Sequence, residues 1–236
     1  TEYNRHFVQG DFCKWYKESG ISRTHTDNFT WTLLQGKSNF LYFTGNKITL
    51  EMKIAGSFCE HRAFVPETME QSDSWKKFTM KQTMSGWYYL PFENKPETSD
   101  WWKMDNASRK KLHGPDLHIT AEVEETAGSD GKGLNIHIKT DGVKNAPFRI
   151  EIACAGAQKV SGPDFEIPAE KGGCLLGRDG IITFENSGEE ISIGPAFSAH
   201  RYTAGKFGSE KASTSCFTLY FTDFIPFDRI IKIRMN

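Results

Sequence analysis

The chain has 236 residues, 25% of them charged, and a formal net charge of −1. This balanced charge lacks the basic excess that attracts a phosphate backbone, so we expect no nucleic-acid partner. The apolar runs are only a few residues long, too short for a bilayer, so we expect no contact with a membrane.

The first residues, 1–27, are polar with scattered aromatic side chains such as Trp15 and Tyr16. We interpret this stretch as an N-terminal arm or edge segment. An alternating texture begins near Phe29 and continues to the end of the chain. The sequence therefore predicts one domain over residues 1–236, with an arm over about 1–27.

Strict alternation of apolar and polar residues predicts half-buried strands. The pattern is clean over 48–54, and it recurs in 117–123 and 134–138. A Gly-rich connection over 128–133 joins the last two stretches, which makes them the best hairpin candidate in the chain. Further strands are expected at 38–44, 76–84, 87–92, 148–152, 180–185, 189–193, 216–222 and 228–234.

The stretches 76–84 and 87–92 read as a pair joined directly through Ser85-Gly86. An excursion follows near 93–115. Within it, residues 99–112 are either a short helix, capped by Ser99-Asp100, or an irregular loop.

Short strands separated by Gly, Pro, Asn and Asp turns are typical of an all-β fold, here a large antiparallel β-sandwich. An internal echo favours two pseudo-repeated halves. Phe58-x-x-His61-Arg62 returns as Phe197-x-x-His200-Arg201. If the halves are real repeats, His61 and His200 should occupy equivalent strands; the alternative is coincidence.

Several kinds of chemistry have no motif in this chain. Zinc-type ligand spacing is missing, so we expect no metal. A nucleophile elbow and a phosphate-binding loop are missing too, so the catalytic residues are unknown and no cofactor is expected. The five cysteines are scattered and odd in number, which favours free thiols.

Aromatic and polar side chains gather between residues 58 and 103, and this stretch carries the candidate ligand site. Sugars present apolar C–H faces that pack on aromatic rings, while their hydroxyls need fixed donors and acceptors. Trp101 and Trp102 lie between charged segments, where a paired Trp either plugs a groove or forms a surface platform. The expected ligand-binding residues are Trp87, Tyr89, Trp101, Trp102, His61, Arg62, Lys103 and His200.

The sequence leaves three functions open. The first is a carbohydrate-recognition or accessory domain of a polysaccharide-handling protein, whose partner is an oligo- or polysaccharide; the nearby Arg and Lys favour an acidic one. The second is a carbohydrate-active enzyme (lyase, hydrolase or isomerase) using His61, His200 and Arg62. The third is a structural or protein-interaction module with buried aromatic side chains.

The compartment is also open. The polar start over 1–4 shows no signal peptide. We expect a secreted or periplasmic protein if a signal peptide has been removed, and an intracellular one otherwise.

Overall fold

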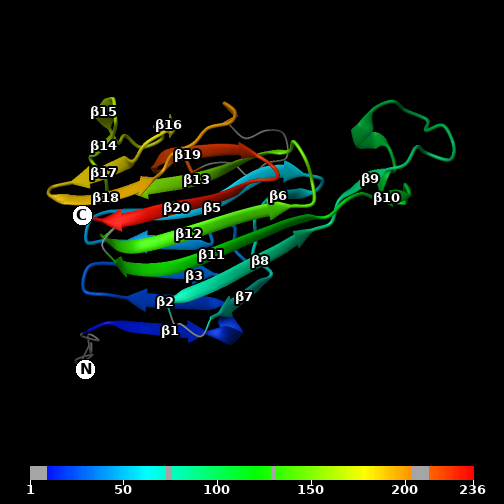
Figure 1. Ribbon diagram of the computed structural model, residues 1–236. Coiled ribbons are helices and arrows are strands. Elements are labelled where there is room, and N and C mark those ends of the chain that lie inside the picture. The colour runs from blue at the N-terminus through cyan, green and yellow to red at the C-terminus, as the bar shows by residue number, and fades with distance from the viewer. Residues whose placement is uncertain (1–9, 73–75, 129–130, 203–212) are drawn as a thin grey trace, which may run out of the picture.

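A computed structural model describes residues 10–72, 76–128, 131–202 and 213–236. Two nine-stranded sheets stack face to face (Figure 1). The described residues form no α-helix, only three short 3-10 turns. The prediction of a large, essentially antiparallel β-sandwich is confirmed.

Sheet A contains, in spatial order, β1 (Phe12–Tyr16), β2 (Ile21–His25), β3 (Thr30–Leu34), β4 (Leu41–Thr44), β5 (Thr49–Phe58), β13 (Pro147–Ala155), β19 (Phe217–Phe224) and β16 (Cys174–Leu176), with β6 (His61–Ala63) on β5. Sheet B contains β15 (Phe165–Pro168), β14 (Lys159–Gly162), β17 (Ile182–Asn186), β18 (Glu189–Gly194), β20 (Asp228–Met235), β12 (Gly131–Asp141), β11 (Leu117–Gly128), β8 (Lys77–Met84) and β7 (Thr68–Gln71). A separate two-stranded sheet contains β9 (Trp87–Tyr89) and β10 (Lys111–His113).

The core lies between the two large sheets and follows the alternation of the sequence. Leu50, Met52 and Ile54 of β5 are buried on one side, and Ile136 and Ile138 of β12 on the other. The predicted hairpin is present as β11 and β12. Each such side chain contributes roughly 1.5–3 kcal/mol when fully buried, so the sandwich is a rigid base for whatever it carries.

Residues 12–25 of the polar N-terminal segment form β1, the edge strand of sheet A, and β2 beside it. The Trp15 ring packs edge-on against Phe78 of sheet B, with ring centroids 5.9 Å apart. This part of the segment therefore belongs to the sandwich. Residues 1–9 lie outside the described residues.

The sequence echo does not mark equivalent strands. It aligns β8 of sheet B with β19 of sheet A, but β8 pairs antiparallel with β7 and β11, whereas β19 pairs antiparallel with β13 and parallel with β16. His61 lies in β6 and His200 lies outside the strands, so the two histidines do not occupy equivalent strands.

Near residue 86 one further expectation is corrected and one open alternative is resolved. Strands form in both halves of the pair expected over 76–92, but β8 pairs with β7 and β11, while β9 pairs with β10. The helix candidate over 99–112 resolves into two 3-10 turns, Trp101–Lys103 and Asn106–Ser108, followed by β10. The expected excursion is confirmed: residues 87–113, here called the lobe, project from one end of the sandwich (Figure 1).

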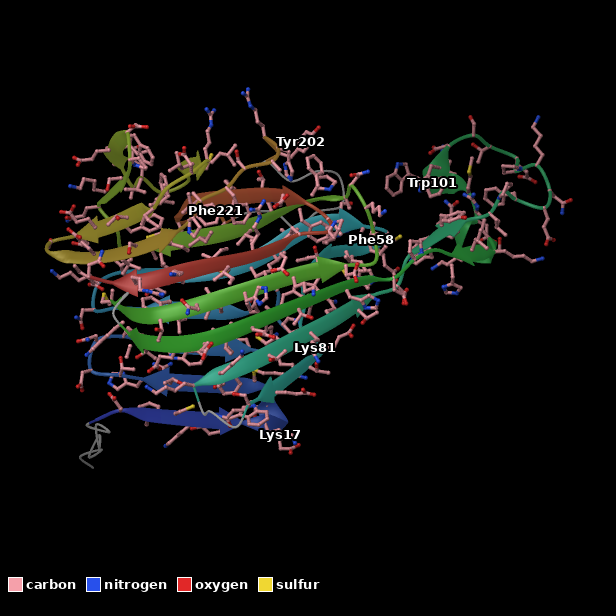
Figure 2. All side chains as sticks on the ribbon, in the orientation of Figure 1. Lys17, Phe58, Lys81, Trp101, Tyr202 and Phe221 are labelled. Atoms are coloured by element: carbon pink, nitrogen blue, oxygen red, sulfur yellow. The ribbon has the colours of Figure 1, made fainter. Side chains whose placement is uncertain are left out.

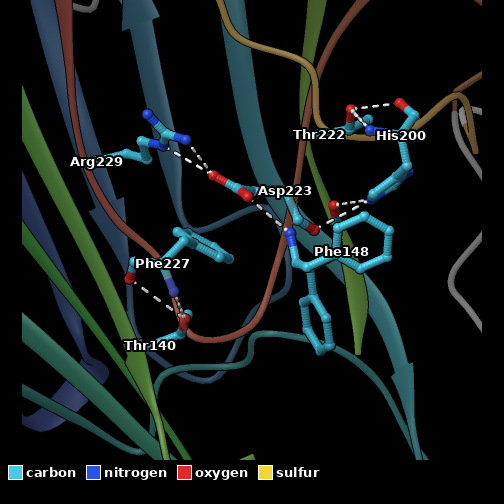
Figure 3. A network of polar contacts seen from close by, with 8 residues as sticks. Thr140, Phe148, His200, Thr222, Asp223, Phe227 and Arg229 are labelled. Atoms are coloured by element: carbon cyan, nitrogen blue, oxygen red, sulfur yellow. Dashed lines mark hydrogen bonds and ion pairs between the residues drawn. The ribbon is translucent and has the colours of Figure 1, made fainter. Parts of the chain in front are cut away.

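Two of the connections that cross between the sheets, 142–146 and 225–227, run side by side. Ile225 donates its N–H to Ala146 O at 2.9 Å, and Asn145 donates its N–H to Ile225 O at 2.7 Å. The Thr140 hydroxyl accepts from Phe227 N at 2.8 Å (Figure 3). The crossing is therefore fixed by hydrogen bonds in a buried place, where an unmade bond is costly.

Thr140→Ala should destabilise the protein by about 1–3 kcal/mol, because it leaves the buried Phe227 N–H without its acceptor. Chemical denaturation followed by tryptophan fluorescence measures this loss. Thr32→Ala, on the partly exposed face of β3, is the matched control and should stay within about 0.5 kcal/mol of wild type. Equal effects of the two changes would contradict the role given to the Thr140 hydroxyl.

Candidate functional site

None of the described residues 87–113 is buried. The lobe therefore lacks the hydrophobic core that normally holds a segment of this length in one conformation. Its order must come from contacts among partly exposed side chains and from its attachment to the sandwich.

Arg109 is the centre of those contacts. Its Nε and Nη2 donate to Leu90 O at 2.9 and 2.8 Å, which ties the two sides of the lobe together. Its guanidinium also lies against three aromatic rings, with 4.9, 4.6 and 5.4 Å from the guanidinium carbon to the ring centroids of Tyr89, Phe92 and Trp101. A guanidinium at such distances is attracted by the ring faces, by about 0.5–1 kcal/mol at exposed sites.

A second cation covers the base of the lobe. Lys111 Nζ lies 3.8 Å from the centroid of the Trp87 ring. The Trp87 and Tyr89 centroids are 4.8 Å apart, and those of Tyr89 and Trp101 are 6.0 Å apart. Three of the expected ligand-binding rings thus form one continuous row, held by two cations.

Trp101 and Trp102 begin a 3-10 turn. The Asp100 carboxylate caps this turn by accepting from Trp102 N at 3.2 Å and also pairs with Lys103 Nζ at 3.4 Å. Trp102 is 83% exposed and Trp101 47%. Large apolar rings so exposed beside polar groups are typical of a binding surface.

A pocket of about 890 Å³ is lined entirely by lobe residues. Its wall includes the apolar Leu90 and Phe92, the cations Lys103 and Arg109, and the carboxylate of Asp105. Arg109 therefore serves both the row of rings and the pocket. Such a mixture of apolar wall and convergent polar groups is what small-ligand sites share.

The neck of the lobe is tight. Cys59 Sγ, in the turn between β5 and β6, donates to Trp87 O at 3.0 Å and accepts from Trp87 N at 3.2 Å. A Cβ at Gly86 would lie 2.2 Å from Pro115 O and 2.9 Å from Phe58 Cζ, so only glycine fits there. The neck thus restricts how the lobe moves relative to the sandwich.

The structure does not bring all expected residues together. Trp87, Tyr89, Trp101, Trp102 and Lys103 share the lobe. His61 and Arg62 lie on the sandwich in β6, where they line a separate pocket of about 520 Å³.

His200 is held by the backbone of the sandwich. Its Nε2 lies 2.9 Å from Phe148 O and 3.1 Å from Asp223 O (Figure 3). Its Nδ1 accepts from Tyr202 N at 3.2 Å. Carbonyls only accept, so Nε2 is the donor in these two contacts. Both ring nitrogens make hydrogen bonds to the backbone, which fixes the orientation of the His200 ring.

Sequence reasoning missed Arg109, Phe92 and Lys111. The only signal was the basic run 109–111 opposite an aromatic segment. Such a run on its own is usually a solvated face, and its contacts depend on how the two sides of the lobe meet.

Sequence reasoning also missed a largely buried polar row on the outer face of sheet A. Lys53, Glu151 and Tyr220 are directly opposite one another on β5, β13 and β19. Arg149 Nε bonds Glu151 on the same face, and both are nearly fully buried. Alternation predicted that these positions would face water.

Burial raises the pKa of Tyr220 from its ordinary value of 10.0 to about 12, and the neighbouring Glu151 carboxylate adds to this rise. Folding therefore favours the neutral phenol. That stabilisation is complete below pH 10, the ordinary value. It is lost as the pH rises toward 12, because the unfolded chain gives up its proton first.

No group of three or more His, Cys, Asp or Glu side chains that could hold a metal occurs in the part of the chain that the structure describes. Within the same residues, no helix has the length and apolar character needed to span a bilayer. No protein-family model, curated protein or solved structure matches the chain.

Arg109→Ala should loosen the lobe and leave the sandwich intact, because Arg109 contacts only lobe residues among those described. We expect limited proteolysis to cut within 87–113 at least about tenfold faster, with little change in the main thermal transition. Lys103→Ala removes another lobe cation whose exposed ion pair contributes about 0–1 kcal/mol, and is the control. Equal cleavage of the two variants would contradict the central role of Arg109.

The raised pKa of Tyr220 predicts how the stability of the protein changes at alkaline pH. Above pH 10, the wild-type protein should lose free energy of unfolding relative to Tyr220→Phe, which has no proton to lose. Urea denaturation of both proteins at a series of alkaline pH values measures the difference. Parallel stability curves would show that the phenol is not perturbed in the folded protein.

Proposed function

We propose that this protein is a carbohydrate-recognition β-sandwich domain whose site is the lobe. The observation that carries the proposal is the row of Trp87, Tyr89 and Trp101 rings, which Arg109 and Lys111 contact. A pocket of about 890 Å³ lies beside this row. Flat rings suit the C–H faces of sugars, and the pocket supplies donors and acceptors for hydroxyls.

A fixed ring row supports binding because little order has to be created when the ligand arrives. Immobilising a flexible side chain costs about 0.5–1.5 kcal/mol on association. In the lobe the Arg109 contacts hold Tyr89 and Trp101 in place beforehand. Trp102 is capped through its backbone, and its ring is the most exposed of the large hydrophobic side chains described.

The charge of the lobe bears on the choice between neutral and acidic sugars. Lys103 pairs with Asp100, and Lys110 pairs with Glu93. A cation already paired with a carboxylate attracts another anion weakly. Attraction of an acidic glycan would therefore rest on Arg109 and Lys111, which lie against aromatic rings.

The other two functions have weaker support. An enzyme using His200 would have to free a ring nitrogen from the backbone, and His61 lines a different pocket. A module with buried aromatic side chains does not fit Trp101 and Trp102. A protein-interaction module fits the exposed rings, and it is one outcome of the binding test.

Trp102→Ala should weaken glycan binding by roughly 1–3 kcal/mol, the scale of a truncated aromatic anchor, with the thermal transition unchanged. Trp101→Ala should weaken it by a similar amount and also loosen the lobe, since Trp101 contacts Arg109. A glycan array followed by fluorescence titration of the best ligand measures both effects.

Tyr16→Ala is the control, since Tyr16 is 52% exposed on edge strand β1. Its affinity should equal that of wild type. If no glycan binds the intact protein, and the protein associates with itself or with another protein through Trp102, recognition of carbohydrate is excluded and the interaction module stands.

A further inference from the structure

A second exposed aromatic patch lies on the sandwich itself. We call it the ledge and define it as His200, Tyr202 and Phe224. Tyr202 is 49% exposed and Phe224 36%. The His200 ring lies between them, with centroids 5.1 Å from the Tyr202 ring and 4.9 Å from the Phe224 ring.

The ledge is fixed from below by the sandwich. The His200 imidazole donates from Nε2 to the carbonyls of Phe148 and Asp223, which belong to β13 and β19. Its Nδ1 accepts from Tyr202 N. The Thr222 hydroxyl donates to His200 O at 2.6 Å (Figure 3). The three rings therefore stand on a built support, like the rings of the lobe.

The ledge and the lobe lie at the same end of the molecule. In Figure 2, Tyr202 lies at the end of the sandwich from which the lobe projects, and the Trp101 ring turns from the lobe back toward that end. Phe224 ends β19 where the chain crosses to sheet B. A chain of several sugars that extended from Trp101 toward the sandwich would approach the ledge.

We propose that the ledge is a second contact surface for the same ligand, so that the site takes an extended glycan chain of several residues. This inference rests on the proposed function of the lobe and adds Tyr202 and Phe224 as ligand-binding residues. Both nitrogens of His200 are used by the backbone, so the ledge offers stacking surface and no free charge from its imidazole. The ledge therefore distinguishes glycans by the length of their chain and by the sugar faces that they present to its rings.

Linked contacts of this kind have a clear thermodynamic signature. Once the lobe holds one part of a chain, contact with the ledge is intramolecular and gains from a high effective concentration. Short ligands reach the lobe alone. The affinity should therefore rise with chain length, and the rise should depend on Tyr202.

The experiment uses two ladders of oligosaccharides, neutral β-1,4-linked glucose and acidic β-1,4-linked mannuronate, each from the disaccharide to the octasaccharide. Isothermal titration gives the affinity of every member. We expect Tyr202→Ala to weaken the longer members of the ladder that binds by about tenfold, the order of one lost aromatic contact, and to leave the disaccharide unchanged. Trp101→Ala should weaken all members.

Tyr202→Leu keeps an apolar side chain over His200 but lacks a flat ring, and should show the same length-dependent loss. Phe224→Ala, on the other side of His200, should show it too, and Tyr16→Ala should not. If Trp101→Ala weakens binding while Tyr202 and Phe224 variants bind every length like wild type, the ledge is overturned and the proposed function survives. If wild type binds no member of either ladder and no glycan of the array, both are overturned.

Discussion

The stacking of one guanidinium on three aromatic rings is the interaction on which the candidate site depends. The lobe has no buried residue with which to form a core. Arg109 replaces that core: it crosslinks the lobe through Leu90 O and holds Tyr89, Phe92 and Trp101 around itself. Lysine could not do this, because it lacks the planar group that both stacks and donates in a fixed direction.

The sandwich provides stability, and the lobe provides the exposed rings of the candidate site. The sandwich buries the apolar faces of two nine-stranded sheets, and two of its crossing connections are fixed by backbone bonds and by Thr140. The lobe gives up burial in order to expose its rings. Rigid scaffolds that present functional groups on projecting segments are common, because loops tolerate the chemistry that cores exclude.

How much of this follows from the sequence depends on the range of the interactions. Strand β5 and the hairpin β11–β12 were predictable, since a period of two is a local property. So was the excursion, whereas the pattern left open whether its paired tryptophans pack into a groove or stand exposed. The partner of β9 was not predictable, because Ser85-Gly86 looks like a tight turn. In the structure, Gly114 donates its N–H to Gly86 O and β9 pairs with β10, so the chain continues into the neck. His200 and Arg62 were grouped with the rings by composition, whereas the fold places both on the sandwich. The buried Arg149 and Glu151 broke the alternation rule, since that rule assumes water on the outer face.

The most direct test observes the indole N–H groups by two-dimensional NMR while a glycan is added. Trp31 is an internal control, because its indole is buried and donates to Glu125 Oε2 at 2.9 Å, and Trp15 lies in the edge strand of sheet A. We expect the signals of Trp87, Trp101 and Trp102 to shift together along one saturating curve while those of Trp15 and Trp31 stay in place. Unchanged lobe signals with every glycan that binds the protein would contradict the assignment of the site to the lobe.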